Sequence, residues 1–554
     1  MEFSFHEHPC AKKRVDGRYE APYEGYPASF CFEYNELPCS PLFKQVMLDP
    51  SLENGFKYLG RVKPTRVSNK PLKEAEVNET IKGYAIESWP DLFKDGRLIS
   101  EYGVSAKYPL AEYTSMKRYA NPYILPIDEP WNYATMMVAE AFSCMQDSSM
   151  LNLNDAFHWL ERQTSPGYPW TLQHMTKAPI LDDEWFIDWY KKWESDIDLK
   201  QADPFFWKAF IKDEVKKLVD LKAHNPRTIL ASPMHATILA FRLYGHMNGK
   251  LTTAGSILET PCCVGITKFN RSWDRLARHI MHFPNMFDGD CTRYDGTMQP
   301  KIFEMIRDFR RSCMNFNPGY KNHYYYYNVV NSLIVGCLGD LYFKSMGQPS
   351  GQGNTLHDNS IGHTSYWFYH WCLIACVAKP DLFSPTWSSF SKHVRLVVMG
   401  DDVIWSCSDV SLPYMNPRSV KDTFKSIGVT LKTSFDDAQP IDKLEFCSMH
   451  FHNYKGVYVP VMKRKKMLAS IFLKKTSHPR VYLRRLLGLR IECWWDEYLR
   501  DIIENLIQYI ERERKHELMT RITNMDGDDA TYEQIKALHW PVLVVENHYL
   551  KAFD

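Results

Sequence analysis

"VRLVVMGDDVIWSC", residues 394–407, places two adjacent carboxylates between two short apolar runs. The runs RLVVM and VIWSC are rich in β-branched and aromatic residues, which predicts two strands joined by a tight turn. Gly400 suits that turn because glycine adopts positive φ without steric cost. Asp401 and Asp402 at the tip repel each other unless a cation or a basic group compensates them. The stretch therefore predicts a hairpin whose tip is either a cation site or a solvated turn.

The tripeptide Gly-Asp-Asp occurs a second time, at residues 527–529 within TNMDGDDATYEQ. This second stretch is polar and predicts a loop before a helix, with Asp529 or Thr531 as the N-cap. A side chain that caps a helix has a structural role. The setting of the tripeptide, rather than the tripeptide itself, therefore distinguishes the two copies.

Length and composition indicate a large globular protein. A chain of 554 residues corresponds to three or four structural units at about 150 residues each. Hydrophobic residues make up 45% and charged residues 24%, which is ordinary for a folded protein with an extensive core. The sequence shows no internal repeat and no low-complexity linker, so we expect the units to pack closely together.

Cysteine usage and hydropathy indicate a reduced compartment and no membrane span. The 14 cysteines show no C-x-x-C pairs and no zinc spacing, and no signal peptide opens the chain, so we expect reduced thiols in a cytosolic protein. The most apolar run, SYWFYHWCLIACVA (365–378), is shorter than the ~20 residues that a bilayer span needs, and it contains His370. The run predicts a buried helix.

The net charge of +1 conceals a strongly basic interval. No Asp or Glu occurs between Glu445 and Glu492. A basic surface of one sign, interleaved with tyrosines, favours contact with a phosphate backbone over a solvated face, which normally mixes signs. The cations of the interval are Lys455, Lys463, Arg464, Lys465, Lys466, Lys474, Lys475, Arg480, Arg484, Arg485 and Arg490.

A second acidic stretch, NMFDGDCTRYDGTMQPKIF (285–303), supplies the partners that a metal site at residues 401–402 would need. Asp288 and Asp290 alternate along a predicted strand, so both side chains lie on one face. Asp295 follows where the chain turns toward the predicted helix PKIFEMIRDFRR. Two-metal phosphoryl transfer needs carboxylates from different strands, so Asp290 and Asp401 on neighbouring strands could serve both ions. An acidic surface loop is the alternative.

A third stretch, MGQPSGQGNTLHDNS (346–360), begins as a Gly/Pro/Ser loop and leads into the apolar helix. Ser350 and Gly351 provide a flexible turn. Thr355 and Asn359 are four residues apart and share one helical face. A hydroxyl and an amide together can recognise a ribose 2′-OH, which both donates and accepts a hydrogen bond. The structural alternative is a capped helix start with polar N-terminal residues.

In this order, the three motifs resemble the palm of viral RNA-dependent RNA polymerases. That family shows D-x4-D, then S-G-x-x-x-T-x-x-x-N, then G-D-D, at roughly these separations. TRYDGT, GQPSGQ and SPGYPW together are similar to the astroviruses, within the picornavirus-like supergroup of positive-strand RNA viruses. The residues that match the three motifs are Asp290, Asp295, Ser350, Gly351, Thr355, Asn359, Gly400, Asp401 and Asp402.

The resemblance extends over roughly residues 160–455. FIKDEVKKLVDLKAHNPRTILASP (210–233) is similar to the fingers loop that grips the incoming triphosphate, with Lys212, Lys216 and Arg227 at its basic positions. TSPGYPW (164–170) resembles the loop that guides the template strand, and LEFCSMHF (444–451) is similar to the hairpin that grips the primer end. Of the template loop, Thr164, Ser165 and Gly167 are the expected RNA contacts.

The resemblance implies an α+β right-hand polymerase fold with an antiparallel palm sheet flanked by helices. We expect residues 1–245 to form the fingers with an N-terminal extension, and residues 300–345 to return to the fingers. The palm would comprise residues 246–299 and 346–460, and the thumb residues 461–554. The basic interval then lies where a product duplex leaves, with Lys463, Arg464, Lys465 and Lys466 as RNA contacts.

The implied activity is template-directed RNA synthesis from NTPs for replication and transcription of a viral RNA genome. Two Mg²⁺ ions, for which Mn²⁺ can substitute, would be held by Asp290, Asp401 and Asp402, while a lysine protonates the pyrophosphate. Lys432 in GVTLKTS is the candidate for that general acid, and Lys443 is the alternative. The implied partners are an RNA template, a product duplex and other viral replication proteins. The implied location is the host cytoplasm, at membrane-associated replication complexes.

Two rivals share parts of this pattern. A reverse transcriptase has the same two-metal palm, but it excludes the 2′-OH with a bulky residue near the second aspartate position. Asp295 is followed by the small Gly296 and Thr297, which favours ribose acceptance together with Asn359. A non-catalytic RNA-binding relic of a palm would be the other rival, and the intact carboxylates argue against it.

Overall fold

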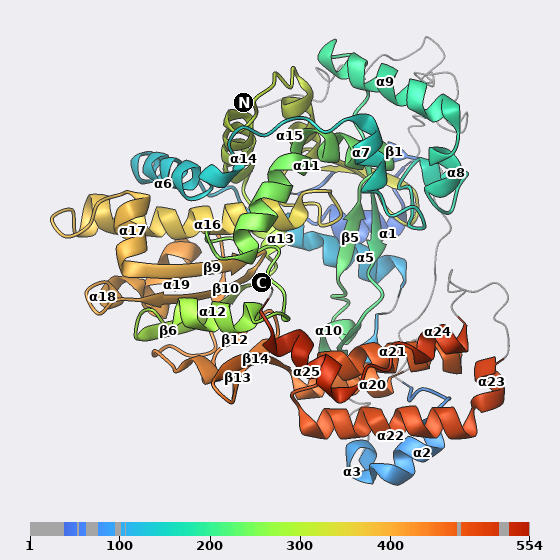
Figure 1. The fold of residues 1–554 in the computed structure, drawn as a ribbon. Helices are drawn as coiled ribbons and strands as arrows, with labels where there is room; N and C mark the ends of the chain where they lie inside the picture. Colours follow the sequence, from blue (N-terminus) through green and yellow to red (C-terminus); the bar gives the residue numbers. More distant parts are fainter. Residues whose placement is uncertain are drawn as a thin grey trace.

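The computed structural model describes residues 38–52, 55–62, 76–94, 101–105, 107–473, 478–519 and 531–552. Figure 1 shows three groups of elements around a central region: a sheet with its helices on the left, a second sheet and several helices at the upper right, and a bundle of C-terminal helices below. The second Gly-Asp-Asp copy lies outside the described residues, but Thr531 caps the next helix, α24 (Tyr532–Lys536), with a full capping box.

The central sheet contains both acidic stretches. Its strands are β6 (Asn285–Cys291), β9 (Val394–Met399), β10 (Asp402–Cys407) and β11 (Leu431–Lys432), in the order β11-β6-β10-β9 and all antiparallel. The predicted hairpin of β9 and β10 is confirmed. We call this four-stranded sheet the palm sheet.

Both faces of the palm sheet are covered, which explains why VIWSC is apolar throughout. Trp405 points to one face, where its ring lies 4.8 Å from that of Trp367 on helix α16 (Thr355–Leu373). Ile404 points to the other face and joins the apolar cluster of Leu276 on helix α12 (Ser272–Ile280). Successive side chains of a strand alternate between faces, so a central strand with two covered faces loses the polar alternation of a surface strand.

A second sheet joins distant parts of the chain. Its order is β1 (Lys57–Arg61), β8 (Asp340–Lys344), β7 (Ser332–Val335), β3 (Phe206–Ile211) and β5 (Thr228–Ala231). Strands β7 and β8 come from the segment 300–345, and in this sheet they pair with β3 and β1 of the N-terminal half. We call this five-stranded sheet the fingers sheet.

The remaining N-terminal elements surround the fingers sheet, and one long helix crosses toward the palm. Helix α11 (Met234–Ser256) runs without interruption through the expected boundary at residues 245–246, so the chain has no break there. The other elements are α1 (Pro41–Met47), β2 (Tyr102–Val104), α5 (Pro109–Met116), η4 (Lys117–Tyr119), α6 (Asp128–Ala141), η5 (Ser143–Met145), α7 (Leu153–His158), η6 (Trp170–Leu172), α8 (Ala178–Leu181), α9 (Glu184–Asp198), β4 (Val215–Lys217) and α10 (Leu218–Lys222).

The palm sheet is completed by helices and by a small three-stranded sheet at its edge. Strands β12 (Glu445–Phe446), β13 (Met449–Tyr454) and β14 (Val457–Met462) form that sheet in sequence order. The predicted buried helix at 365–378 is confirmed as the end of α16 followed by the π-helical turn η7 (Ile374–Ala378). The other elements are α13 (Tyr294–Thr297), α14 (Pro300–Ser312), α15 (Lys321–Val330), α17 (Trp387–His393), α18 (Leu412–Met415), α19 (Pro417–Ser426) and η8 (Ile441–Lys443).

The C-terminal helices have an apolar core of their own, which includes a segment from the N-terminal region. The helices are α20 (Arg464–Phe472), α21 (Pro479–Glu492), α22 (Glu497–Glu513), α23 (Lys515–Met519), α24 and α25 (Val542–Leu550). Val77, Ile81 and Ala85 are buried in this core, and helices α2 (Lys82–Ser88) and α3 (Pro90–Phe93) lie beside α22 in Figure 1. The chain from residue 76 to 93 thus packs with the C-terminal helices rather than with the fingers sheet.

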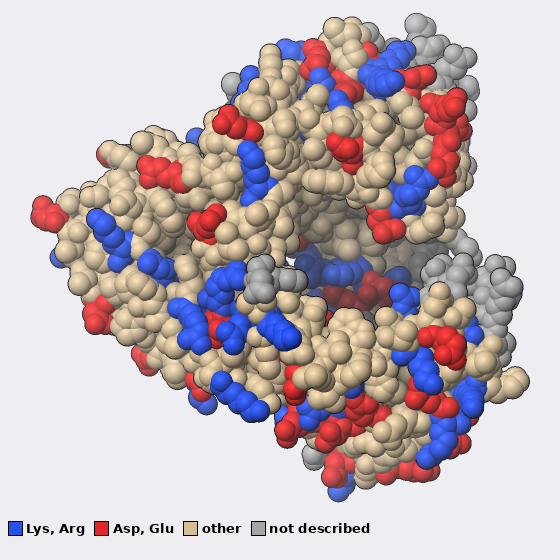
Figure 2. Space-filling view, viewed as in Figure 1, with Lys and Arg blue, Asp and Glu red and all other residues tan. Residues whose placement is uncertain are grey.

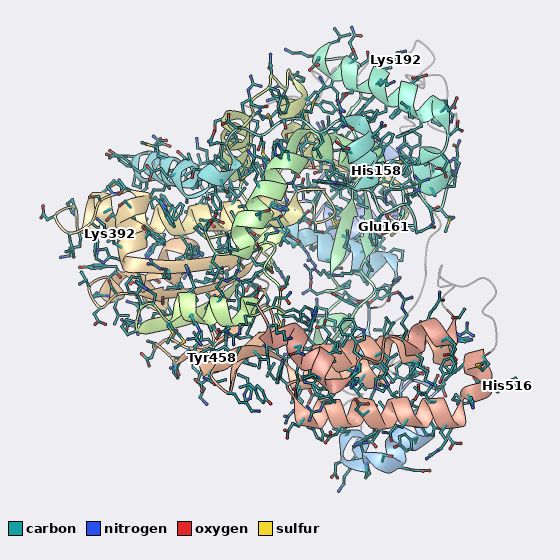
Figure 3. The ribbon with its side chains drawn as sticks, viewed as in Figure 1. His158, Glu161, Lys192, Lys392, Tyr458 and His516 are labelled. Carbon is teal, nitrogen blue, oxygen red and sulfur yellow. The ribbon has the colours of Figure 1, made fainter. Side chains whose placement is uncertain are left out.

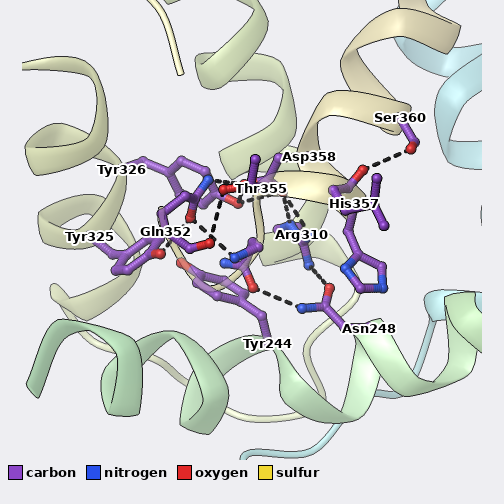
Figure 4. A network of polar contacts seen from close by, with 12 residues as sticks. Tyr244, Asn248, Arg310, Tyr325, Tyr326, Gln352, Thr355, His357, Asp358 and Ser360 are labelled. Atoms are coloured by element: carbon purple, nitrogen blue, oxygen red, sulfur yellow. Dashed lines mark hydrogen bonds and ion pairs between the residues drawn. The ribbon is translucent and has the colours of Figure 1, made fainter. Parts of the chain in front are cut away.

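A buried ion pair fixes the start of α16 (Figure 4). Arg310 of α14 and Asp358 of α16 are fully buried, and the Arg310 Nη2 lies 2.7 Å from Asp358 Oδ1. Tyr326 of α15 also donates to Asp358, at 3.1 Å, and Gln352 Nε2 donates to it at 3.0 Å. Gln352 belongs to the loop before α16, so this network holds that loop against three helices.

Within the described residues, no helix is long and apolar enough to span a bilayer.

We predict that Arg310→Met lowers the melting temperature strongly. Removing one partner of a buried ion pair leaves an uncompensated charge and costs about 3–5 kcal/mol. Arg311→Met is the matched control on the same helix, because Arg311 is exposed and donates to the side chain of Asn317; it should change stability by less than about 0.5 kcal/mol. Thermal unfolding of both variants measures the difference, and equal melting temperatures would contradict the prediction.

Candidate active site

The palm sheet brings the carboxylates of the two acidic stretches together. Strands β6 and β10 pair in a register that sets Asp402 directly opposite Asp290. Asp401 lies in the adjoining turn, and its backbone carbonyl accepts a hydrogen bond from the Cys291 N–H at 3.0 Å. The turn has the predicted backbone, since Gly400 has φ of 64°. The structure therefore brings Asp290, Asp401 and Asp402 close together, with Asp402 rather than Asp401 on the strand that pairs with β6.

These three carboxylates repel one another. Burial, followed by the charges of Asp401 and Asp290, raises the pKa of Asp402 to about 7. Burial and the charge of Asp401 likewise raise the pKa of Asp290 to about 6. Burial also raises the pKa of Asp401, and Arg227 opposes that shift. Each shift means that the protein alone does not compensate the negative charge, which is the condition under which a cation binds.

Asp288 has a different role from Asp290, although both lie on one face of β6. Asp288 is 3% exposed, and its carboxylate accepts hydrogen bonds from the Ser434 N–H at 3.0 Å and from the Glu445 N–H at 2.7 Å. It therefore fastens two neighbouring segments to the palm sheet. The alternation of Asp288 and Asp290 in the sequence does not distinguish this structural carboxylate from the one at the site.

Lys432 lies next to the carboxylates. It is exposed on β11 and sits opposite Asp290 in the strand pairing, and its charge opposes the raised pKa of Asp290. Lys443, the alternative candidate, lies at the end of η8. Of the two lysines, Lys432 has the closer electrostatic relation to the carboxylates.

Asn359 of the S-G-x-x-x-T-x-x-x-N motif contacts Asp295, the second aspartate of the D-x4-D motif. The Asn359 Nδ2 donates to Asp295 Oδ1 at 3.1 Å, while the Asn359 Oδ1 is buried without a protein partner. Burial raises the pKa of Asp295, and the amide of Asn359 opposes that shift. Thr355 donates its hydroxyl to the Gln352 carbonyl at 2.9 Å, within its own loop. An orphaned amide oxygen can accept a hydrogen bond from a ligand hydroxyl.

At two glycines of this site, a side chain would clash with neighbouring backbone. A Cβ on Gly351, next to Ser350, would lie 2.4 Å from the Leu230 carbonyl of β5, so the loop before α16 is pressed against the fingers sheet. A Cβ on Gly296 would lie 2.0 Å from the Arg118 carbonyl. The space beside Gly296 is thus filled by the backbone of Arg118, which gives this glycine a packing role. Thr297 is also buried and donates to the Tyr294 carbonyl at 3.0 Å.

The three predicted triphosphate-binding residues have different surroundings. Arg227 is exposed, and its charge acts on both Asp295 and Asp401. Lys216 donates to the Asn225 carbonyl at 2.6 Å, and Lys212 lies 4.0 Å from Glu214. Both lysines therefore already contact groups in the segment between β3 and β5. Arg227 is the one whose charge reaches the carboxylates.

Arg118 is a residue of this site that no sequence pattern indicated. Its guanidinium donates to the Pro226 carbonyl at 2.8 Å, beside Arg227, and its charge acts on Asp295. No local pattern marks it, because Arg118 follows α5 and is remote in sequence from every motif.

The predicted template loop is rigidly attached to α11. Gly167 has φ of 75°, and a Cβ there would lie 2.4 Å from the Ser232 carbonyl. Thr164 donates to the Glu161 carbonyl at 2.8 Å and contacts Lys177, and Ser165 accepts a weak hydrogen bond from the Gly167 N–H at 3.3 Å. Figure 3 shows Glu161 on the fingers side of the central region.

Several cations of the basic interval form ion pairs with acidic residues from other parts of the chain. Arg464 makes two hydrogen bonds, of 2.9 and 3.1 Å, to Asp496, whose side chain is 4% exposed. Lys463 lies 2.6 Å from Glu445 and Lys465 lies 3.5 Å from Glu101, while Lys466 donates to Ser448 at 3.4 Å. Arg464 compensates a buried carboxylate, and its side chain remains 58% exposed. The pairs of Lys463 and Lys465 are exposed and therefore weak.

The surface is hollowed between the fingers side and the C-terminal helices. Figure 2 shows this hollow near the middle of the face, with both basic and acidic atoms on its floor. Within the described part of the chain, no group of three or more His, Cys, Asp and Glu side chains forms a ready-made metal shell. The carboxylate set still fits Mg²⁺, which takes one or two carboxylates and completes its octahedron with water and phosphate oxygens.

Comparison with known proteins places the chain in a family. A family model described as viral RNA-dependent RNA polymerase matches residues 101–512. The chain is 25% identical over 374 residues to the non-structural polyprotein 1AB of Ovine astrovirus 1, which covers 65% of this chain and 27% of that protein. It is 24% identical over 302 residues to the genome polyprotein of Brome streak virus, which covers 54% of this chain and 9% of that protein. The chain thus spans a small part of the curated relatives that it matches.

A solved structure shows the same fold. The Sicinivirus 3Dpol RNA-dependent RNA polymerase superposes with a TM-score of 0.67 at 15% sequence identity, over 87% of this chain and 99% of that chain. The predicted α+β right-hand polymerase fold and the predicted likeness to astroviruses are confirmed. Because the family model spans more than half of its length, the protein belongs to the family of viral RNA-dependent RNA polymerases.

Proposed function

We propose that this chain adds NTPs to an RNA 3′-OH under the direction of an RNA template, with Asp290, Asp401 and Asp402 as the ligands of two Mg²⁺ ions. The observation that supports this most is the cross-strand pair of Asp290 and Asp402, with Asp401 in the adjoining turn and all three pKa values raised. Bound Mg²⁺ would lower the pKa of the attacking hydroxyl and neutralise the departing pyrophosphate, and Mn²⁺ would supply the same charge.

The residues around the carboxylates have distinct parts in this proposal. Arg227 would bind the triphosphate, since an arginine can contact phosphate oxygens through two N–H groups, and Lys212 and Lys216 would add positive charge beside it. Lys432, opposite Asp290, would protonate the pyrophosphate. Ser350, at the end of the loop pressed against β5, would contact the nucleotide from the other side.

In this proposal, the Asp295–Asn359 pair recognises the sugar of the nucleotide. The amide of Asn359 is oriented by its hydrogen bond to Asp295, which leaves its oxygen free to accept from a 2′-OH. Thr355 lies on the same helical face, one turn earlier. A ribose would satisfy the buried oxygen and a deoxyribose would not, so this geometry favours an RNA polymerase over a reverse transcriptase. The intact carboxylates likewise oppose a non-catalytic relic.

The RNA would enter past the loop with Thr164, Ser165 and Gly167 and leave along the C-terminal helices. Lys463, Lys465 and Lys466 lie at the start of α20, and their own side chains are exposed. We further propose that the chain works with other viral replication proteins in the host cytoplasm, at membrane-associated replication complexes. The polyprotein context of its relatives supports this association.

The catalytic assignment predicts that Asp290→Ala and Asp401→Ala abolish nucleotide addition and leave RNA binding largely intact. Removing a metal ligand withdraws several kcal/mol of transition-state stabilisation. Primer extension with Mg²⁺ and NTPs measures the loss, and filter binding measures the RNA affinity. Asp528→Ala, in the second Gly-Asp-Asp, is the control and should be nearly silent. Near-normal elongation by either site variant would refute the assignment.

The sugar assignment predicts that Asn359→Ala lowers kcat/KM for NTPs far more than for dNTPs. Only the ribose loses a hydrogen-bond partner in this variant. Single-nucleotide addition with paired NTP and dNTP substrates gives the two values. Equal losses for both sugars would show that Asn359 only supports the fold around Asp295.

The exit assignment predicts that neutralising Lys463, Lys465 and Lys466 to Gln makes the salt dependence of RNA affinity shallower. The slope of log affinity against log salt should decrease by up to about one for each lysine that pairs with a phosphate in the intact protein. Arg464 is left intact because it compensates the buried Asp496. Lys191→Gln on α9, an exposed lysine, is the control. An unchanged slope in the triple variant would remove the exit role.

A further inference from the structure

Helix α16 contacts the catalytic turn through two side chains that no motif includes. The Gly400 N–H donates to the Ser360 Oγ at 2.9 Å, and the Gly400 carbonyl accepts from the His363 Nδ1 at 3.0 Å. Both side chains have no exposed surface. The two hydrogen bonds fix the peptide units on either side of Gly400, and the second of those units contains the nitrogen of Asp401.

The chemistry of these groups allows only one arrangement of protons. A carbonyl oxygen only accepts, so the His363 Nδ1 must carry a hydrogen, and burial keeps the ring neutral by lowering its pKa to about 4. The Nε2 is then an acceptor, and the Cys291 Sγ lies 3.4 Å from it as the donor. Ser360 donates its own hydrogen to the Leu356 carbonyl at 2.7 Å, so its oxygen is free to accept from Gly400.

These contacts join both acidic stretches to one helix. Cys291 is the neighbour of Asp290 on β6, and its N–H donates to the Asp401 carbonyl at 3.0 Å. His363 therefore contacts the residue after one metal ligand and the residue before the other. A turn at positive φ that carries two like charges would otherwise relieve their repulsion by changing its backbone.

The same helical turn also carries the sugar contact. Asn359 directly precedes Ser360, and His363 lies one helical turn further on. We call the two hydrogen bonds from Ser360 and His363 to Gly400 the clamp. A shift of α16 that moves the Asn359 amide therefore also moves the clamp. Asp358, the buried partner of Arg310, completes this run and fixes the helix against α14. One rigid segment thus holds both the nucleotide contact and the metal-binding turn.

We propose that Ser360 and His363 are positioning residues that hold Asp401 in register with Asp290 and tie that register to the sugar contact of Asn359. The inference rests on the proposed two-metal function. Neither residue touches the substrate in this proposal. Loss of the clamp should weaken the metal site and slow the chemical step, while the affinities for RNA and nucleotide stay close to those of the intact enzyme.

The test compares four variants of the full chain. Ser360→Ala and His363→Leu each remove one hydrogen bond to Gly400. His363→Asn keeps a donor near the position of Nδ1 and should rescue most of the loss. Ser365→Ala is the matched control, because Ser365 is equally buried on α16 but donates to the Gly362 carbonyl, away from the turn. If His363→Leu does not fold, Ser360→Ala, which removes a single oxygen atom, decides the question.

Three readouts separate positioning from packing. Amide hydrogen exchange of residues 397–405, measured without metal, should become several-fold faster in Ser360→Ala and His363→Leu. Mg²⁺ affinity measured by calorimetry should fall by about 10–100-fold, as for other residues that support metal ligands. In single-nucleotide addition, kcat should fall by a similar factor, with the KM for NTP and the Kd for RNA within about twofold.

The outcomes distinguish this inference from the proposed function. If Asp290→Ala and Asp401→Ala are inactive while the two clamp variants exchange, bind Mg²⁺ and react like the Ser365→Ala control, the clamp inference is overturned and the proposed function stands. If the clamp variants lose activity only through a higher KM, or if His363→Asn is no better than His363→Leu, positioning by the His363–Gly400 bond is refuted. If the two aspartate variants are active, the proposed function itself fails.

Discussion

Repulsion among Asp290, Asp401 and Asp402 is the constraint on which the centre of this structure depends. Burial raises the pKa of all three carboxylates, the charge of Asp401 raises those of Asp290 and Asp402 further, and folding alone does not relieve that cost. The protein tolerates it because the surrounding backbone has little freedom: β6 and β10 share a full ladder of pairs, and both sheet faces are covered by large side chains. A divalent cation would relieve this repulsion, which is the physical basis of the proposed metal site.

A second set of buried polar groups holds the loop before α16 in place. The loop before α16 is pressed against β5 through Gly351, and Gln352 in that loop bonds to Asp358, whose charge is matched by Arg310. A half-satisfied network of this kind would be worse than an apolar core, so its completeness matters more than the strength of any one bond. The loop that we propose contacts the nucleotide is thereby held by the same helix that contacts the turn at Gly400.

The sequence predicted well those features that depend on local pattern. The β9–β10 hairpin, the buried helix at 365–378 and the convergence of the two acidic stretches follow from residue type, spacing and order. Contacts between remote segments could not be predicted in this way. Arg464 was assigned to a one-signed surface because its partner, Asp496, lies beyond the interval, and Arg118 reaches Asp295 only through the fold. The contact of Gly296 with the Arg118 backbone was likewise not predictable, because a small residue indicates a close approach but not what approaches.

The packing of residues 76–93 into the C-terminal helices has a topological consequence. Tyr84 stacks on Tyr509 with ring centroids 4.3 Å apart, Phe93 meets Phe472 at 5.3 Å, and Val215 from the fingers hairpin packs against the same core. Residues 76–93 and the segment around Val215 are thus both packed against the C-terminal helices, and separating them would expose several aromatic side chains to water.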